Sequence, residues 1–342
     1  MKIGWLACLT ILVASPAAAQ TAKPLFEASD VIRLTIKGPV PAVVRSRSRD
    51  PVPAVLQTST GETLPIALSA RGLTRRMADT CDFPPLRVDF TRPPPPTSLF
   101  AGQRRLKLVT HCRNEGSFQQ HVLLEYAAYR LYNVLTPMSF RARLATIDYQ
   151  QADGRSVISR VGFFIEDTDD VAKRNGMNEI RAGERIPIPT LSPMESARYA
   201  LFQHMIANHD WSMRAGPAGD ECCHNAKLIG RSGVAPGAVI PVPYDFDYSG
   251  LVNPPYAVPP EQLNIRSVRD RLYRGYCIHN REAAVVAAQM RSARPQLQAA
   301  LASVPGLEPR ILGRASSFLD GFFGLIATDA DTDSKVLKRC VG

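Results

Sequence analysis

Hydrophobic and polar residues alternate over short runs in the first part of the chain, as they do in half-buried β-strands. Residues 31–36 are rich in β-branched side chains, and this run ends at Gly38-Pro39. Residues 143–149 and 156–165 flank the turn sequence Ala152-Asp153-Gly154, which predicts a hairpin. Further strands are predicted at 52–56, 64–68, 86–90 and 104–109.

Helical periodicity appears first at residues 117–135, where apolar side chains recur every three or four positions until Thr136-Pro137. A capping box with an early proline at 192–195 opens a second helix, which runs to about residue 207. After Gly250 the pattern predicts three more helices, at 261–277, 282–304 and 307–326.

This order of elements predicts an α+β fold with the two-lobed plan of a protein kinase. We expect a β-rich N-lobe with one helix at residues 20–166 and a mainly helical C-lobe at residues 167–342. A cleft between the two lobes would hold the functional residues.

Composition fits a globular protein, with 45% hydrophobic and 21% charged residues. The formal net charge of +10 suits an anionic partner such as a nucleotide, phosphate or cell-surface polymer, although general solubility is the better explanation of it. No dense run of Lys and Arg is interleaved with aromatic residues, so we do not expect nucleic-acid binding.

The first 19 residues have the pattern of a secretory signal peptide. One Lys precedes the apolar run 3–14, and small residues end at Ala19, before Gln20. We therefore expect an exported protein, periplasmic or secreted, with no transmembrane segment after cleavage.

Six of the seven cysteines would remain after loss of Cys8 with the leader. An even number in an exported chain favours disulfides, but the sequence does not choose among the 15 pairings. A zinc site at Cys222, Cys223 and His224 is the alternative, and it is weaker because adjacent ligands point in different directions.

A carboxylate on the apolar side of the first helix needs a partner. Glu125 lies near the middle of that helix, beside Leu124, Ala128 and Leu131. An unpaired buried charge is costly. Lys107 lies 18 residues upstream, between two leucines on the preceding strand. We therefore expect Lys107 and Glu125 to form an ion pair in the cleft.

Oxygen-bearing side chains gather between residues 204 and 250. Asp210 follows a helix, and Asn225 precedes the short apolar segment AKLI. Asp245 and Asp247 follow the apolar run VIPVPY and point the same way along an extended segment. Such oxygens suit Mg²⁺ and the phosphates that it carries, whereas the alternative is that they are solvated turn formers.

Two other segments carry candidates for cofactor contact. A basic loop follows the strand at 64–68, and in it Gly72 allows close backbone approach while Arg71 suits a phosphate. An ordinary hairpin loop with solvated arginines is the alternative. Glu166, at the end of the second hairpin strand, is the remaining cofactor-binding candidate.

Over residues 30–250 the chain resembles the spore coat protein H (CotH) kinase family. The resemblance rests on LSARGLTRR, LKLV, QQHVLLEYAAYRLYNVLTP, VGFFIED and NHDWS…HNAKL…PYDFDYSG, in that order. It implies use of ATP with Mg²⁺, or Mn²⁺, for phosphoryl transfer to a protein acceptor. It further implies that Lys107 contacts the phosphates and that Asp210 is the catalytic base. Asn225, Asp245 and Asp247 would then hold the metal.

Two other functions remain open. A catalytically inactive pseudokinase, acting as a binding or structural module of the cell envelope, fits the 15-residue separation of Asp210 and Asn225. Kinase catalytic loops separate the same pair by five residues. A metal-dependent hydrolase would use His209, Asp210, Asp245 and Asp247, although no histidine pair has helical metal-ligand spacing.

We predict that the mature protein begins at Gln20 and has its six remaining cysteines in disulfides. Intact-mass measurement of exported protein, before and after reduction, would test both points. A mass that includes residues 1–19, or six free thiols without reduction, would contradict the prediction.

Overall fold

The computed structural model describes residues 22–342, and its β-strands in residues 32–165 close into a barrel. The predicted signal sequence, with its cleavage point before Gln20, lies outside the described residues. The strands follow one another around the barrel in the order β1-β2-β3-β4-β5-β7-β6. Their bounds are β1 (Ile32–Lys37), β2 (Val52–Thr58), β3 (Thr63–Ala70), β4 (Leu86–Phe90), β5 (Arg105–Val109), β6 (Ala142–Gln150) and β7 (Ser156–Ile165).

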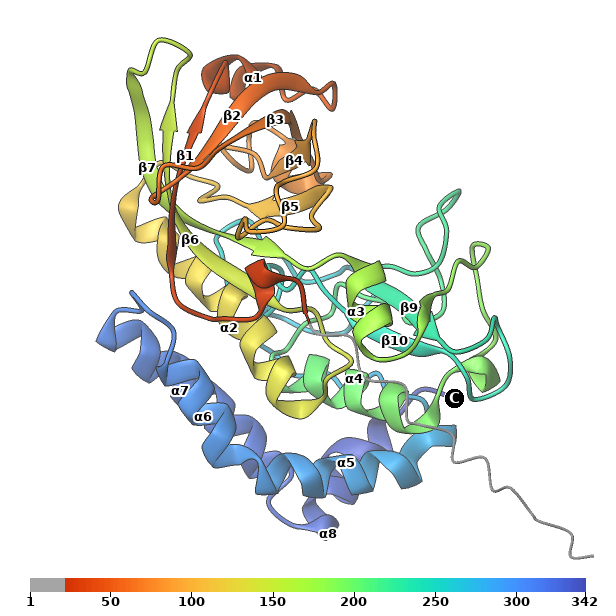
Figure 1. Ribbon diagram of the computed structural model, residues 1–342. Coiled ribbons are helices and arrows are strands. Elements are labelled where there is room, and N and C mark those ends of the chain that lie inside the picture. Colours follow the sequence, from red (N-terminus) through yellow and green to blue (C-terminus); the bar gives the residue numbers. More distant parts are fainter. Residues whose placement is uncertain (1–21) are drawn as a thin grey trace, which may run out of the picture.

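Barrel closure depends on one pairing between distant parts of the chain. β1 and β6 pair in parallel, from Ile32 opposite Ala145 to Lys37 opposite Gln150, while the other neighbours are antiparallel. The two-lobed kinase-like fold with a sheet in its N-lobe is therefore wrong. The α+β class is confirmed, because helices follow the barrel (Figure 1).

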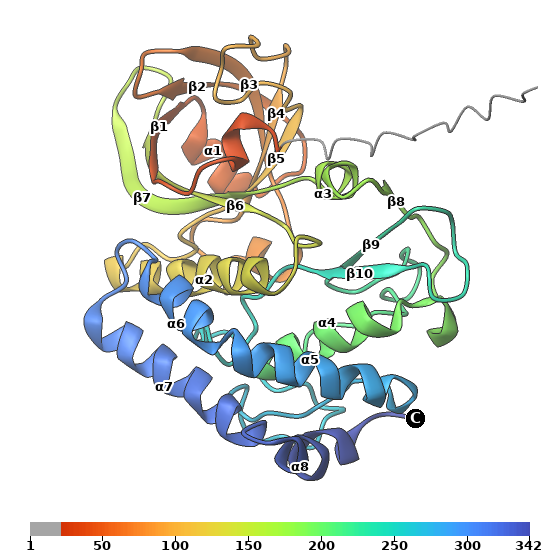
Figure 2. The same ribbon diagram turned by 60° about the horizontal axis from the view of Figure 1, so that its bottom comes forward.

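The barrel interior is filled by alternate strand residues. Leu34 and Ile36 of β1 point into a core that also contains Val40 and Val43 of the short helix α1 (Val40–Ser46). Figure 2 looks along the barrel and shows α1 at its end. Gly162 of β7 permits a close approach, since a Cβ atom there would come within 2.6 Å of the Val109 carbonyl oxygen on β5.

Helix α2 (Gln119–Leu135) packs between the barrel and the helices of the second half (Figures 1 and 2). Tyr126, Tyr129 and Tyr132 are buried in a core shared with the outer faces of β6 and β7. Ten of its 17 residues are buried, so this helix is enclosed by protein instead of lying on the surface. Its central position explains why a charged residue on it, Glu125, must be neutralised by a neighbour.

The second half combines helices with a small sheet in the order β10-β9-β8. Within residues 166–342 the strands and α-helices are α3 (Thr168–Arg174), β8 (Asn178–Glu179), α4 (Pro193–Met205), β9 (Ala226–Gly230), β10 (Ile240–Pro243), α5 (Asn280–Ser292), α6 (Arg294–Ala302), α7 (Pro309–Leu325) and α8 (Asp329–Asp331). None of the helices in residues 22–342 is long and apolar enough to span a membrane.

Two of the predicted C-terminal helices differ in the structure. Residues 261–277 contain no regular helix before the short turn Cys277–His279, because their arginines bond to backbone carbonyls elsewhere in the fold. The predicted helix 282–304 is two helices, since Pro295 starts α6 and cannot continue α5.

Three disulfides fit the expectation of an oxidised, exported chain. Cys81 pairs with Cys112, Cys277 pairs with Cys340, and the neighbours Cys222 and Cys223 pair with each other. The zinc alternative at Cys222, Cys223 and His224 is therefore wrong, because both sulfurs are already bonded.

Replacement of Gly162 by Ala should lower the free energy of unfolding by about 1–3 kcal/mol, the usual cost of overpacking. The new methyl group would meet the backbone of β5, which cannot move aside without disturbing the barrel. Urea unfolding would measure the loss. Gly116→Ala is the control, since nothing lies within 4 Å of a Cβ atom there, and an equal loss in both variants would contradict the explanation.

Candidate metal and phosphate site

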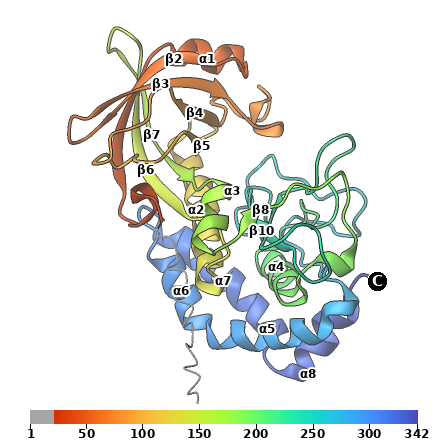
Figure 3. The same cartoon turned by 45° about the vertical axis from the view of Figure 1, so that its right-hand side comes forward.

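A cavity of about 510 Å³ brings together most of the residues singled out in the sequence. It is lined by the loop after β3, by the segment between α4 and β9, and by the turn after β10. Figure 3 shows the barrel, α2 and the small sheet with β8 and β10 in a view from the side. The predicted residues on its wall are Arg71, Gly72, Asp210, Asn225, Asp245 and Asp247.

Three carboxylates meet at one side of the cavity. Glu125, Asp245 and Asp247 each offer an oxygen, and these oxygens lie within 4.8 Å of one another. Asp245 is part-exposed to the cavity, whereas Asp247 and Glu125 are buried. This donor set consists only of oxygen, which suits Mg²⁺ or Mn²⁺ better than zinc.

Arg75 lies between these carboxylates and was missed by the sequence analysis. Its Nη1 is 2.9 Å from Glu125 Oε2, its Nη2 is 3.1 Å from Asp245 Oδ1, and its Nε is 3.2 Å from Asp247 Oδ2. The hydroxyl of Tyr256 donates a further hydrogen bond to Asp247. One guanidinium thus faces three carboxylates, which leaves an excess of negative charge when all three are ionised.

Burial and mutual repulsion control protonation in this cluster. Burial raises the pKa of Asp247 well above its usual range, and Asp245 and Glu125 add to this effect while Arg75 opposes it. Burial likewise raises the pKa of Glu125 against the pull of Arg75. For Arg75, burial acts to lower the pKa, but the three carboxylates outweigh it and raise the pKa further.

The predicted Lys107–Glu125 ion pair is wrong. Glu125 is bound by Arg75, and Lys107 makes no ion pair within the described part of the chain. Its ammonium instead lies 5.2 Å from the ring centroid of Tyr244, over which Lys227 also lies at 5.7 Å. The distant loop 71–76 delivers Arg75 to the place where we expected Lys107.

Cations gather around Tyr244, the residue directly before Asp245. Burial, together with the charges of Arg71 and Lys227, lowers the pKa of Lys107 to about 8. Arg71, Lys227 and Tyr244 line the cavity, whereas Lys107 is not among its lining residues and lies near the Tyr244 ring. Three positive groups without full neutralisation form a place where a phosphate would be favoured.

Asp210 and Asn225 are adjacent in space despite their separation in sequence. Asn225 Nδ2 donates to the backbone oxygen of Asp210 at 2.7 Å and to Asp210 Oδ2 at 2.9 Å. His224 Nε2 lies 2.7 Å from Asp210 Oδ1, and this hydrogen bond raises the pKa of His224. The sequence analysis did not predict the contact between His224 and Asp210. The position of His224 directly before Asn225 could have indicated that it lies near the site.

Two site residues adopt a backbone conformation that is uncommon without glycine. Asn225 has φ of 49° and Asp245 has φ of 63°, both in the left-handed region. Asn and Asp enter this region more readily than other side-chain-bearing residues. Such conformations often occur where function requires a fixed geometry, and here both residues face the same cavity.

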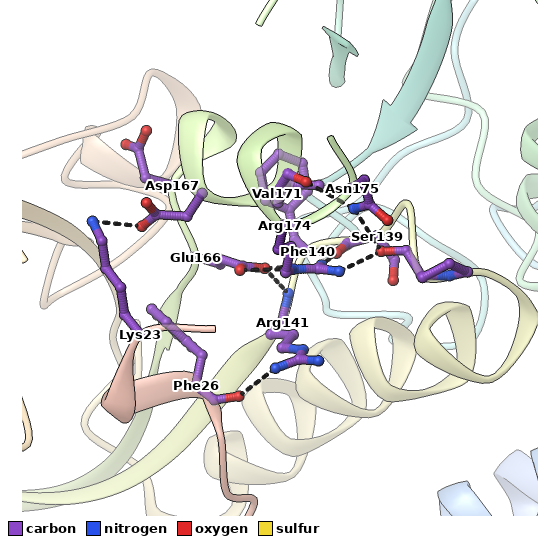
Figure 4. A network of polar contacts seen from close by, with 12 residues as sticks. Lys23, Phe26, Ser139, Phe140, Arg141, Glu166, Asp167, Val171, Arg174 and Asn175 are labelled. Atoms are coloured by element: carbon purple, nitrogen blue, oxygen red, sulfur yellow. Dashed lines mark hydrogen bonds and ion pairs between the residues drawn. The ribbon is translucent and has the colours of Figure 1, made fainter. Parts of the chain in front are cut away.

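Glu166 lies outside the cavity, so its predicted cofactor contact is not supported. Figure 4 shows it between Arg174 and Arg141. Arg174 Nε donates to Glu166 at 3.0 Å, and the Arg141 backbone N–H donates at 2.9 Å. Burial raises the pKa of Glu166 and Arg174 opposes this, which is the pattern of a structural ion pair.

His209 also lies away from the cavity wall. Its ring nitrogen Nε2 is 2.7 Å from the carbonyl oxygen of Asp270, and burial lowers its pKa. This is the environment of a structural histidine, so the hydrolase hypothesis loses one of its four expected residues.

No family model matches the chain, and the search of curated proteins returned no match. The resemblance to the CotH kinase family therefore rests on the quoted motifs alone and stays a prediction.

The raised pKa values give a pH prediction. Asp247 and Glu125 bind protons more tightly in the folded chain than in the unfolded one. Their stabilising effect is complete below the unfolded-state values, about 4, and is lost as pH rises through the folded values. The contribution of these two carboxyls to the free energy of unfolding should therefore fall with rising pH, whereas His204 and His111, whose pKa values burial lowers, contribute in the opposite direction. Asp247→Asn should remove its part and so change the measured pH dependence toward higher stability at high pH.

Urea unfolding across pH 4–8 would measure the slope. Asp79→Asn removes an exposed carboxylate outside the cluster and is the control. A wild-type slope that is unchanged by Asp247→Asn would contradict the assigned protonation.

Proposed function

We propose that the chain is an exported enzyme that uses Mg-ATP to transfer a phosphoryl group to a protein acceptor. The observation that carries the proposal is the division of charge within one cavity. Arg71 and Lys227 are suited to phosphate oxygens, and Asp245 and Asp247 to the metal that accompanies them. The choice of a protein as acceptor comes from the resemblance in sequence.

The donor set fits a magnesium ion. Asp245 and Asp247 belong to a group of carboxylates close enough to share one ion, and Asn225 lines the same cavity. In this proposal Asp245, Asp247 and the amide oxygen of Asn225 would hold the ion, so all its protein ligands would be oxygen atoms. When bound, Mg²⁺ would neutralise charge on the phosphates. Asp245 would be reached first, because it is the most exposed of the three clustered carboxylates.

The chain's own residues have separate tasks in the transfer. Arg71, Lys227 and Lys107 would bind and orient the phosphate oxygens. Asp210 would accept the proton of the acceptor hydroxyl as the new oxygen–phosphorus bond forms. The bond from the γ-phosphorus to its bridging oxygen breaks in the same step, and ADP leaves. His224 and Asn225 hold Asp210 in position through its two carboxylate oxygens.

An inactive binding module is the second candidate, and one observation favours it. Arg75 already neutralises part of the carboxylate cluster through three ion pairs, so the fold is stabilised there without a metal. In an active enzyme, Arg75 would have to give up part of its contact with the Asp245 and Asp247 oxygens so that these could bind the metal. The three disulfides are compatible with export under either function.

ATP should raise the melting temperature of the full chain only when Mg²⁺ or Mn²⁺ is present, by mass action on the folded state. Asp245→Ala and Asp247→Ala should abolish or sharply reduce the shift. Asp210→Ala should keep the shift and remove transfer to an acceptor. Differential scanning fluorimetry and transfer of labelled γ-phosphate to a protein mixture would measure the two effects.

Asp79→Ala, an exposed substitution outside the cavity, is the matched control for the aspartate variants. Absence of any shift with millimolar Mg-ATP would remove the main support for nucleotide binding. A shift without transfer in the wild type would favour the inactive binding module instead.

A further inference from the structure

A second charged concavity lies in the helical part of the molecule, away from the cavity described above. It has a volume of about 590 Å³ and is formed by the loop before α5 and one face of α7. In Figure 2, α7 lies on the opposite side of α2 from the barrel. Four arginines line the concavity, Arg269, Arg271, Arg310 and Arg314, and none of its lining residues is acidic.

Two of these arginines are fixed by the same aromatic ring. The guanidinium carbons of Arg269 and Arg271 lie 4.4 Å and 3.9 Å from the ring centroid of Phe318. Arg269 also donates to the carbonyl oxygen of Gly250 at 3.1 Å, and Arg271 donates to that of Met205 at 3.3 Å. These acceptors are neutral, so they orient the guanidiniums without cancelling their charge.

No carboxylate among residues 22–342 forms an ion pair with Arg269 or Arg271. Burial lowers the pKa of Arg271 to about 10, and the charge of Arg269 adds to the effect. Burial also lowers the pKa of Arg269, and Arg314 contributes. Like charges held together in this way are stabilised when an anion binds between them.

Helix α7 supplies the other two arginines and leaves room beside them. Arg310 and Arg314 are one turn apart, exposed, and take part in none of the ion pairs among residues 22–342. Gly313 and Gly321 present no side chain to the concavity. At Gly321 a Cβ atom would lie only 3.5 Å from Arg271 Nη1, so a longer side chain would fill the space next to that guanidinium.

We propose that this concavity binds a phosphate or sulfate group through Arg269, Arg271, Arg310 and Arg314. Arginine suits such a group because its planar fork donates two parallel hydrogen bonds to two oxygens. The absence of a carboxylate from the lining favours an anion over a zwitterion. The group belongs either to a small soluble anion or to an anionic lipid headgroup, and the chemistry of recognition is the same. This inference is independent of the proposed function.

Inorganic pyrophosphate, titrated calorimetrically into the full chain without divalent metal, tests the site. Arg310→Gln with Arg314→Gln should weaken its binding about tenfold or more, since each charge-assisted hydrogen bond contributes more than a neutral one. Gly313→Glu should weaken it similarly by placing a carboxylate among the arginines. Arg92→Gln with Arg104→Gln removes the same charge from two exposed arginines of the barrel side and should change the affinity little.

A third pair of substitutions separates this site from the first cavity. Arg71→Gln with Lys227→Gln removes cations from that cavity and should leave binding at the arginine concavity intact. Vesicles of phosphatidylglycerol, compared with phosphatidylcholine, give the lipid arm of the experiment. Retention of wild-type binding to both pyrophosphate and phosphatidylglycerol in the Arg310/Arg314 double variant would overturn the proposal, as would an equal loss in the Arg92/Arg104 control.

Discussion

The fold depends on neutralising a cluster of three carboxylates, of which Glu125 and Asp247 are buried and Asp245 faces the cavity. Arg75 does this, and its partners come from α2 and from the turn after β10. Arg75 itself lies in the loop between β3 and β4, so its ion pairs join the barrel to the remainder of the chain. Removal of one member of such a network costs more than an exposed ion pair would, because the others remain buried and unpaired.

This arrangement has a second effect, on the chemistry of the cavity. The negative charge that Arg75 leaves uncompensated is concentrated near Asp245, the carboxylate with access to the cavity. The cations around Tyr244 lie near Asp245, which opposes the lowering of the Lys107 pKa, but within residues 22–342 they form no ion pair with the cluster, so groups suited to a metal and groups suited to phosphate occur side by side. A metal–phosphate complex complements both regions at once, whereas either component alone satisfies only one.

Local patterns predicted local structure well. The strands at β1 to β7, helix α2 and helix α4 follow the alternation, periodicity and capping signals, because each signal is set by near neighbours. Barrel closure was missed because β1 and β6 are more than a hundred residues apart, and no local signal specifies their parallel pairing. The loop at 261–277 was missed for a similar reason, since distant carbonyls hold its arginines.

The candidate site was predicted to the same extent as the fold: local patterns identified several of its residues, but contacts between distant parts of the chain were missed. Sequence alone selected Asp210, Asn225, Asp245 and Asp247, and these four residues line one cavity. It also indicated that Glu125 needs a cation, but it identified the wrong one. Arg75 lies 50 residues away from Glu125 along the chain, and the pair of arginines in LTRR was its only local signal.

Closure of the barrel and the composition of β10 have a consequence for behaviour at high concentration. A closed barrel offers no free strand edge to another chain. In the small sheet β10 is an outer strand, and it carries Pro241 and Pro243 at alternate positions. A proline nitrogen has no hydrogen to donate to a neighbouring strand. Both proline nitrogens point to the outer edge of β10, so this edge lacks two of the donors that an added strand would need. The other outer strand, β8, is only two residues long. The described sheets therefore resist strand addition, and with it the edge-to-edge aggregation to which open sheets are prone.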